Sequence, residues 1–349
     1  MKECQAALSN EAQPYVEDKI MVEYASSETK LNLQNSRSGE LKLDESAVVA
    51  PCEYIRSLHS KDIRKKLIDS FNIWFQLPTN LTTAVSEIIN DLHNASLILD
   101  DIQDGSLLRR GSPATHCIFG NAQSVNSATY MFMNTCLRIQ SLQLLKPTAM
   151  DTLLKGTMGL FVGQSWELKW KFHVRCPSVR EYMAMIDGKT GAMFTMLVHL
   201  MHSMSNSSVS LVEFDRFTIL LGRFYQVRDD YINLQDDKYS EQKGFCEDLD
   251  EGKFSFPVIS CCNSDPIAGD ILLGIFRQSQ GGTTVSRNMK TYMLDLIKKS
   301  GAFEATWELL QELKNEMCEA LAELEAAAGK PNPALWRMME MLAAIQQPK

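Results

Sequence analysis

Two long apolar segments of this sequence each end in adjacent aspartates, and this pattern constrains the fold more than any other feature. The first ends in Leu97-Ile-Leu-Asp-Asp-Ile-Gln-Asp-Gly-Ser-Leu-Leu-Arg-Arg-Gly111, and the second is Phe224-Tyr-Gln-Val-Arg-Asp-Asp-Tyr-Ile-Asn-Leu234. On a helix, Asp100 and Asp104 stand one turn apart on the same face, with Asp101 beside Asp104. Carboxylates this close repel one another, so a cation is expected among them.

The cation that best suits such a cluster is a hard divalent metal. Magnesium prefers oxygen ligands and takes one or two carboxylates together with water and phosphate oxygens. Asp100, Asp101 and Asp104 therefore predict a magnesium–diphosphate site. Asp229 and Asp230 would form the opposite rim of one cavity if the two helices face each other. One such cluster is also typical of a solvated helix end, but two within apolar segments are not.

Few residues interrupt the helical periodicity of this chain. Its 349 residues include only 18 Gly and 11 Pro, and 45% of them are hydrophobic. Long apolar-periodic segments without such breaks favour an all-α protein over a sheet. We expect a single large helical bundle around a central cavity over residues 46–349. Residues 1–45 are polar and weakly periodic, which predicts a flexible N-terminal tail.

Charge and cysteine content restrict the partners and the compartment. A net charge of −8 argues against nonspecific binding of nucleic acid, and it opposes an anionic substrate except where metals and local Lys and Arg reverse the field. The nine cysteines include no CxxC pair, so neither a zinc site nor a disulfide framework is expected. The cysteine usage favours a reducing cytoplasm, and the N-terminal residues lack the basic-then-apolar order of a signal peptide. The longest apolar stretch, 192–204, is too short to span a bilayer.

The two aspartate motifs resemble the paired motifs of class I (trans-) isoprenyl diphosphate synthases. From about residue 51 to 257 the chain is most similar to fungal geranylgeranyl diphosphate synthases. The resemblance implies the class I isoprenoid synthase fold, isopentenyl and allylic diphosphates as substrates, and a homodimer or higher homo-oligomer. It also implies three magnesium ions per active site, held by Asp100, Asp101, Asp104, Asp229 and Asp230.

The resemblance further assigns the cations of the site to two groups. In the family a Gly-Lys-x-x-Arg element, a His before the first motif and the second Arg after it bind isopentenyl diphosphate; the matching positions are Lys61, Arg64, His93 and Arg110. Here Ser60 replaces the family's Gly, which alters the expected turn. The allylic diphosphate would meet a second group of cations and polar residues, namely Arg109, Lys189, Thr190, Gln226, Asn233, Lys243 and Lys253.

Some of these positions are also notable without the resemblance. Lys189 lies in an apolar segment, where an ammonium needs an anionic partner. His93 precedes Asp100 by two turns and shares its face, although a lone His is more often a satisfied core residue. Gln164 and Glu167 would either face the cavity or bond to each other. A polar loop follows the second motif, and its carboxylates are expected to be solvated: Asp236, Asp237, Asp250 and Glu251.

The two kinds of anion site predict the chemistry. A diphosphate bound to metal becomes a leaving group, so that substrate ionises, while the double bond of the other substrate attacks the cation and proton loss follows. Asp100, Asp101, Asp104, Lys189, Asp229 and Asp230 are the expected catalytic residues. Small side chains at Ala95 and Ser96 leave the cavity open beyond fifteen carbons.

The product suggested by the resemblance is the twenty-carbon geranylgeranyl diphosphate, made from farnesyl diphosphate or from the shorter dimethylallyl and geranyl diphosphates. A twenty-five-carbon product remains open. A class I terpene cyclase typically carries a different second motif, Asn/Asp-Asp-x-x-Ser-x-x-x-Glu. A catalytically silent regulatory subunit typically lacks one motif.

Overall fold

The computed structural model describes residues 43–60, 62–142, 148–235, 245–279 and 285–348. The chain divides into two compact units, Met1–Ala47 and Val48–Lys349. Of the first unit only residues 43–47 are described, and there Asp44 accepts a hydrogen bond from the Ser46 N–H. The flexible tail expected over residues 1–45 lies almost wholly outside the described residues and stays a prediction.

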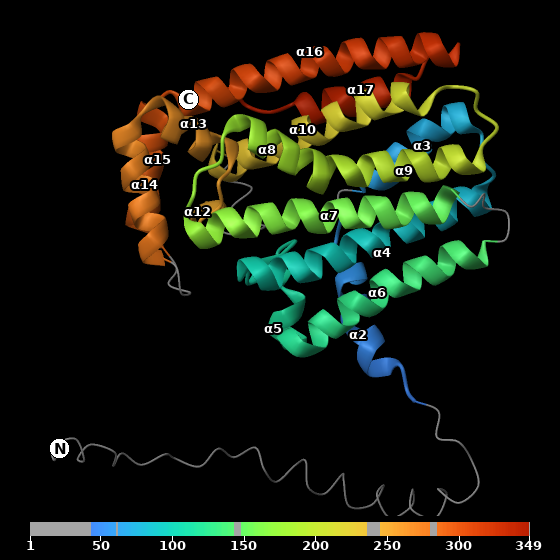
Figure 1. Cartoon of the computed structure of the whole chain (residues 1–349), viewed down its shortest axis with the longest axis horizontal. Coiled ribbons are helices and arrows are strands. Elements are labelled where there is room, and N and C mark those ends of the chain that lie inside the picture. Colours follow the sequence, from blue (N-terminus) through green and yellow to red (C-terminus); the bar gives the residue numbers. More distant parts are fainter. Residues whose placement is uncertain (1–42, 61, 143–147, 236–244, 280–284, 349) are drawn as a thin grey trace, which may run out of the picture. The chain divides into compact units, whose positions relative to one another are not determined.

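The second unit is built from helices, which confirms the prediction of an all-α protein (Figure 1). Its first half contains α2 (Ser46–Ser57) from Val48 onward, α3 (Ile63–Phe75), α4 (Thr79–Asp104), α5 (Thr115–Phe119), α6 (Asn121–Ser141) and α7 (Thr148–His173). Its second half contains α8 (Val179–Ile186), the π-helical turn η1 (Asp187–Gly191), α9 (Ala192–Met204), α10 (Leu211–Gln235), α12 (Glu247–Asp250), α13 (Phe256–Ser264), α14 (Pro266–Ser279), α15 (Arg287–Lys299), α16 (Ala302–Ala328) and α17 (Pro333–Ala343).

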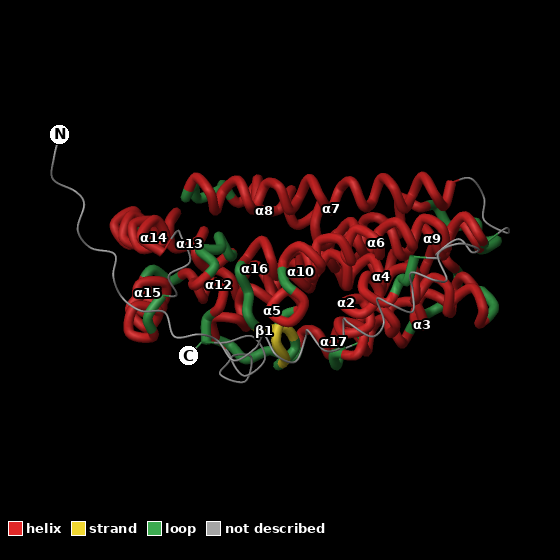
Figure 2. Tube along the Cα trace, turned by 90° about the horizontal axis from the view of Figure 1, so that it is seen from below, coloured by secondary structure: helices red, strands yellow, loops and turns green. Residues whose placement is uncertain are grey.

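The long helices pack in pairs around one core. Helix α10 contacts α16, α4 contacts α6, and α7 contacts α9, while α14 and α15 stand together at one end of the unit (Figures 1 and 2). On α10 the inward face is aromatic, and Phe214, Phe217 and Phe224 are at most 1% exposed. Burying each such ring stabilises the fold by about 1.5–3 kcal/mol. The apolar residues that recur at helical spacing in the sequence therefore form the packing surface of the bundle.

A β-hairpin with two-residue strands follows α4 and contains both arginines of the first motif. Strand β1 (Leu108–Arg109) pairs antiparallel with β2 (Ser112–Pro113), and Arg109 lies opposite Ser112. The turn is Arg110-Gly111, with φ of 57° and 78°. Positive φ at both central residues is the turn geometry that matches the twist of paired strands. Arg109 belongs to strand β1 and Arg110 to the left-handed turn, and they reach different neighbours: Arg109 contacts Asp101, and Arg110 contacts the Ile55 and Leu58 carbonyls.

The helical segment after α8 contains a π-helical turn that the sequence did not predict. In η1 the backbone widens over Asp187-Gly-Lys-Thr-Gly191 before α9 begins. Two glycines of neighbouring helices allow the close approach. A Cβ on Gly163 would lie 2.9 Å from the backbone nitrogen of Lys189, and one on Gly222 would lie 2.6 Å from the Gly191 Cα. Helices α7 and α10 therefore hold η1 between them, backbone against backbone.

Within the described residues, no helix combines the length and the hydropathy needed to cross a membrane. The cytoplasmic location expected from the sequence stays a prediction.

Candidate active site

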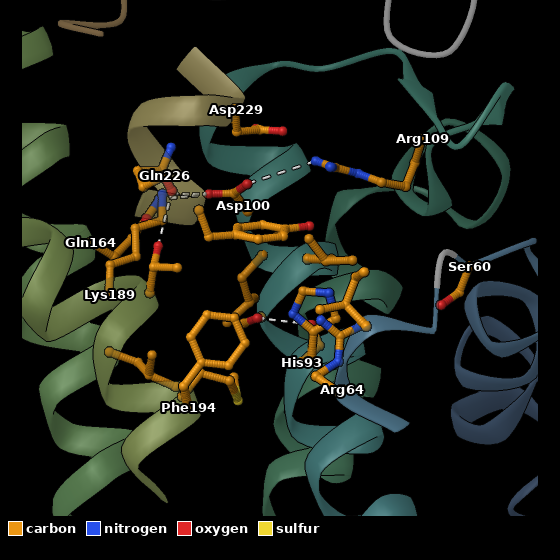
Figure 3. Close-up of a pocket in the computed structure, with 18 of the residues that line it drawn as sticks. Ser60, Arg64, His93, Asp100, Arg109, Gln164, Lys189, Phe194, Gln226 and Asp229 are labelled. Atoms are coloured by element: carbon orange, nitrogen blue, oxygen red, sulfur yellow. Dashed lines mark hydrogen bonds and ion pairs between the residues drawn. The ribbon is translucent and has the colours of Figure 1, made fainter. Parts of the chain in front are cut away.

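A cavity of about 480 Å³ lies inside the bundle, as the sequence predicted. It is lined by residues from α3, α4, α6, α7, η1, α9 and α10, together with the hairpin and Lys253. Figure 3 shows its two chemically different ends and its apolar depth. Asp100 and Asp229 lie at one end, Arg64 and His93 at another, and Phe194 lies toward the depth.

The acidic end joins the two aspartate motifs. Asp100 and Asp229 both line the cavity and lie near each other in Figure 3, although 129 positions of sequence separate them. Asp100 accepts hydrogen bonds from the Lys189 ammonium at 3.2 Å and the Gln164 amide at 3.1 Å, and Arg109 is 3.7 Å away. The two motifs therefore contribute side chains to one cavity.

Lys189 is placed at this end by the π-helical turn. Its ammonium donates to Glu167 at 2.7 Å as well as to Asp100, and the two carboxylates raise its pKa despite burial. Glu167 and Gln164 thus bond to partners on other elements and not to each other. Arg223 holds the beginning of η1 with two hydrogen bonds to Asp187, at 2.7 and 2.6 Å. Thr190 donates to Gln226 at 2.9 Å, and both line the cavity.

Asp101 and Asp230 do not line the cavity, so the structure corrects their prediction as metal ligands. Both side chains are completely buried. Arg109 donates to Asp101 at 2.8 Å through Nε. Asp230 accepts hydrogen bonds from the Tyr182 hydroxyl and from the Phe256 N–H, at 2.9 Å for the latter. Buried carboxylates with several donors position their neighbours, here the arginine and the segment around Phe256.

Lys253 contacts Asp230, and both Lys253 and Asn233 contact Asp248. The Lys253 ammonium lies 3.1 Å from Asp230 and 3.3 Å from Asp248, and it also lines the cavity. Its pKa is raised by these carboxylates although burial opposes the charge. Asn233 was predicted to bind substrate, but it is buried and accepts a hydrogen bond from the Asp248 N–H at 3.3 Å. Because it is not among the cavity-lining residues, it serves the fold of the α12 segment.

The third aspartate of the first motif pairs with a lysine that the sequence analysis missed. The Lys171 ammonium donates to Asp104 at 2.6 Å and lies 3.8 Å from Glu251. Lys171 falls four positions after Glu167 on the same helical face, and this spacing was the available signal. Glu251 also accepts a hydrogen bond from Ser106 at 3.2 Å. Asp104 itself is not among the cavity-lining residues.

The prediction that Asp250 and Glu251 are solvated is wrong. The Glu251 side chain is 10% exposed and lies in the Lys171 cluster. Asp250 pairs with Lys290 of α15 and accepts a hydrogen bond from the Val285 N–H at 3.0 Å. These ion pairs join α12 to distant helices, which the charge run alone did not reveal. Asp236 and Asp237 lie outside the described residues.

The carboxyls of this cluster titrate far above their ordinary range. Burial, with the charges of Glu251 and Asp100, raises the pKa of Asp104 to about 8. Burial, with the charge of Asp248, raises the pKa of Glu251 to about 7. Lys171 opposes both shifts without cancelling them. In the absence of added cations, the folded protein therefore favours the protonated carboxyls.

Metal-free protein is expected to lose stability as the pH rises from about 5 to about 9. The unfolded chain has carboxyl pKa values near ~4, so the stability supplied by neutral Asp104 and Glu251 is complete below that pH and is lost as the pH passes their folded values. Thermal unfolding in a chelator, followed across this pH range, measures the effect. Glu251→Gln should flatten the decline and raise Tm at the alkaline end; a wild-type Tm that climbs with pH would contradict the assignment.

The basic end of the cavity combines Arg64, His93 and Arg110. Burial lowers the pKa of Arg64 to about 10, and it lowers that of Arg110 as well. Within the part of the chain that the structure describes, neither arginine forms an ion pair with a carboxylate. Arg64 donates to Asn90 at 3.4 Å, and Arg110 donates to the Ile55 and Leu58 carbonyls and to Asn94. Two partly buried guanidinium groups therefore have no carboxylate partner among the residues that the structure describes.

The charge state of His93 differs from the prediction, which grouped this residue with the cations of the site. Burial and the neighbouring charges of Arg64 and Arg110 hold its pKa well below the ordinary value. The ring is therefore neutral at physiological pH and offers the cavity a hydrogen-bonding group, not a positive charge. It lines the cavity on the same face of α4 as Asp100, as the two-turn spacing predicted.

The element before α3 tolerates Ser60 in place of glycine. Ser60 lines the cavity, and its hydroxyl accepts a hydrogen bond from the Asp62 N–H at 3.0 Å. Among the described residues of this turn, Asp62 is left-handed, with φ of 50°, and Ser60 is not among the residues of positive φ. Position 60 therefore does not need the conformational freedom of glycine. Lys61 and Lys243, both predicted to bind substrate, lie outside the described residues.

The two residues predicted to control product length lie on different faces of α4. Ser96 lines the cavity, one turn before Asp100. Ala95 is completely buried in a separate apolar cluster with Cys52, Ile55, Ile98, Ala128 and Met131. Its prediction as a length-determining residue is therefore corrected, because the helix turns its side chain toward α2 and α6. The apolar depth is instead lined by Leu97, Leu99, Phe132, Leu160, Phe161, Met193 and Phe194.

No three His, Cys, Asp or Glu side chains are already gathered around a common point in the described ranges. The oxygen atoms at the acidic end come from Asp100, Asp229 and the Gln226 amide. Such a set supplies one or two carboxylates to an ion, which is the number magnesium uses when phosphate oxygens complete its shell. The residues thus fit a metal that binds together with a diphosphate.

Comparison with known proteins is consistent with this geometry. The sequence profile described as polyprenyl synthetase matches residues 45–293. Fusoxypene synthase of Fusarium oxysporum is 48% identical over 84% of this chain and 42% of its own length. Bifunctional terpene synthase FUP1 of Fusarium proliferatum is 41% identical over 94% of this chain and 44% of its own length. The chain thus spans less than half the length of these two relatives.

A third relative is matched over most of both chains. Geranylgeranyl pyrophosphate synthase 3 of Zymoseptoria tritici is 43% identical over 86% of this chain and 82% of its own length. The profile match covers well over half of the residues, including both aspartate motifs, the π-helical turn and every described residue that lines the cavity. The chain belongs to the polyprenyl synthetase family.

Proposed function

We propose that this chain is a magnesium-dependent trans-prenyltransferase that condenses an allylic diphosphate with isopentenyl diphosphate to give geranylgeranyl diphosphate. Farnesyl diphosphate is the expected allylic substrate, and the shorter geranyl and dimethylallyl diphosphates are alternatives. The observation that carries the proposal is one cavity with two unlike anion sites. One has carboxylates of both motifs and Lys189; the other has Arg64 and Arg110, which form no ion pair with a carboxylate of the described residues.

The unlike ends assign different roles to the two substrates. Magnesium at Asp100 and Asp229 would draw electron density from a diphosphate ester and make it a leaving group. Lys189 and Arg109 already contact Asp100, so they lie where they would neutralise the departing diphosphate. Arg64, Arg110 and neutral His93 would hold the second diphosphate without activating it, so its carbon chain acts as the nucleophile. Its double bond attacks C1 of the allylic group, and loss of a proton restores an allylic diphosphate.

Purified protein supplied with magnesium, farnesyl diphosphate and isopentenyl diphosphate tests the proposal. Mass spectrometry of the extracted product should show geranylgeranyl diphosphate, and a chelator should abolish its formation. Hydrocarbon formed from farnesyl diphosphate alone would favour a terpene cyclase, a class to which the names of several relatives point. No turnover with any allylic substrate would favour a regulatory subunit.

A twenty-five-carbon product is the second candidate, and the relatives' names favour it. Sesterfisherol synthase of Neosartorya fischeri is 41% identical, and sesterterpene synthase btcA of Neocamarosporium betae is 42% identical. Sesterterpenes have twenty-five carbons, so the second candidate product for this chain is geranylfarnesyl diphosphate. The same assay distinguishes the candidates by product mass.

Cavity depth is expected to set product length through Ser96. Replacing Ser96 by Phe would place a ring in the cavity one turn below Asp100, so we expect the product to stop at fifteen carbons. Product analysis with dimethylallyl and isopentenyl diphosphates measures this change. Phe161→Ala removes an aromatic side chain from the apolar depth and should shift the product toward twenty-five carbons.

The matched control is Ala95→Phe, on the neighbouring position of α4. Because Ala95 packs against Cys52 and Met131 outside the cavity, the added ring should destabilise the protein by about 1–3 kcal/mol and leave the product length of the folded fraction unchanged. A shortened product from Ala95→Phe with an unchanged one from Ser96→Phe would reverse the structural assignment.

We also propose that the protein forms a homo-oligomer through α6 and α7. These helices also expose large apolar side chains away from the cavity lining: Val125, Met133 and Leu137 on α6, and Leu154, Met158, Val162, Trp166 and Phe172 on α7. Apolar patches of this extent are typical of protein interfaces. Light scattering after size-exclusion chromatography should give a multiple of the chain mass, and Met158→Asp should reduce it. A monomeric wild-type protein would contradict this part of the proposal.

A further inference from the structure

Helix α2 holds residues of the basic end of the cavity, although none of its own residues lines that cavity. Its apolar face packs on α4 and α6 in one buried cluster (Figure 1). Arg56 of α2 donates two hydrogen bonds to Asp91 of α4, at 2.8 and 2.9 Å, and Asp91 is only 4% exposed. A bidentate pair of this kind fixes the orientation of both partners. Helix α2 is therefore fastened to the helix that carries His93.

The C-terminal end of α2 holds the guanidinium group of Arg110. This group donates to the Ile55 and Leu58 carbonyls, at 3.4 and 3.3 Å. The last carbonyls of a helix have no partner within the helix, and they carry the negative end of its dipole. They therefore orient the guanidinium without supplying a full negative charge, and Arg110 still lines the cavity.

The backbone of the hairpin turn is held by the same helix. Tyr54 donates its hydroxyl proton to the Pro113 carbonyl at 2.7 Å, and Pro113 pairs with Leu108 in the hairpin. The Tyr54 ring packs edge-on against Phe119 of α5, with ring centroids 6.0 Å apart. Pro113 follows Arg110 by only three positions. Helix α2 thus fixes Arg110 at two places, its guanidinium group and the turn from which the side chain extends.

We propose that Tyr54 is a positioning residue for isopentenyl diphosphate and that it acts through Arg110, an inference that rests on the proposed function. The Tyr54 hydroxyl keeps the hairpin docked on α2, so the Arg110 guanidinium lies at the basic end before the substrate arrives. Donors that are already ordered bind an anion more tightly, because less conformational entropy is lost on binding. Tyr54 itself does not line the cavity, so its hydroxyl affects the diphosphate only through Arg110.

Isothermal titration calorimetry with isopentenyl diphosphate, on the full chain in a chelator, tests this inference. Without metal, binding reports the basic end of the cavity. Tyr54→Phe removes a single oxygen atom and should raise Kd about 5-fold. In assays with magnesium, the KM for isopentenyl diphosphate should rise by a similar factor, while kcat and the KM for farnesyl diphosphate stay unchanged. A general loss of packing would change all three.

A double-mutant cycle separates positioning from packing. In an Arg110→Gln background, Tyr54→Phe should cause no further rise in Kd, because the group through which it acts is already gone. Arg64 remains in this background, so binding stays measurable at higher ligand concentration. The matched control is Tyr292→Phe, which removes a hydroxyl from a half-exposed ring on α15 and should bind like wild type. Circular dichroism establishes that each variant is folded.

The outcomes distinguish this inference from the proposed function. Equal Kd values for Tyr54→Phe and wild type would overturn the positioning role, and so would equal effects of Tyr54→Phe with and without Arg110. A wild-type protein that forms no product, with the 5-fold difference in Kd retained, would refute the proposed function and support the positioning role. A wild-type protein that binds no isopentenyl diphosphate would overturn both.

Discussion

Asp100→Asn is expected to lower kcat by about 10³-fold or more. The substitution keeps the size of the side chain but removes the negative charge at the acidic end of the cavity. An amide is a weaker ligand for magnesium, so the leaving group would lose much of its activation. Steady-state kinetics with farnesyl and isopentenyl diphosphates, over a range of magnesium concentration, measure the loss.

Folding should survive this change. Lys189 retains its hydrogen bond to Glu167 at 2.7 Å, and Arg109 retains Asp101, so neither cation is left without a partner. The matched control is Glu87→Gln, which removes an exposed carboxylate of the same helix that pairs with Arg138. Exposed pairs contribute about 0–1 kcal/mol, and this variant should keep full turnover. Equal kinetics for Asp100→Asn and wild type would refute the metal role of the first motif.

Gly222→Ala is expected to destabilise the protein by about 1–3 kcal/mol and to lower turnover of the folded fraction by about 10²-fold. The new Cβ would lie 2.6 Å from the Gly191 Cα and 2.8 Å from its nitrogen, so one backbone must move. The segment that moves is η1, which carries Lys189 and Thr190 into the cavity. Urea unfolding and kcat, measured on the same preparation, report the two effects.

Gly274→Ala is the control for Gly222→Ala. It lies inside α14, and a Cβ there meets nothing within 4 Å. Alanine has a better helix propensity than glycine by about 1 kcal/mol, so this variant should be slightly more stable and fully active. If both glycine variants behaved alike, the close packing of α10 on η1 would not be what constrains position 222.

Much of the helical framework followed from periodicity. In α14 (Pro266–Ser279), α15 (Arg287–Lys299) and α16 (Ala302–Ala328) the buried residues recur at the helical spacing of the apolar residues in the sequence. An amphipathic helix carries its core-facing stripe in its own residues, so it can be recognised without its neighbours. The turn η1 was not predicted, because its wider backbone depends on glycines of two other helices, Gly163 and Gly222.

The sequence alone determined the helical class, the two acidic helix ends and the basic residues near them, because these are local patterns of charge and apolar period. Only the tertiary structure decided which of those side chains face the cavity. Neighbouring positions such as Asp100 and Asp101, or Ser96 and Ala95, differ by a rotation of about 100° around one helix. Which side becomes cavity and which becomes core depends on where α2, α6 and α7 pack, and that is a property of the whole bundle.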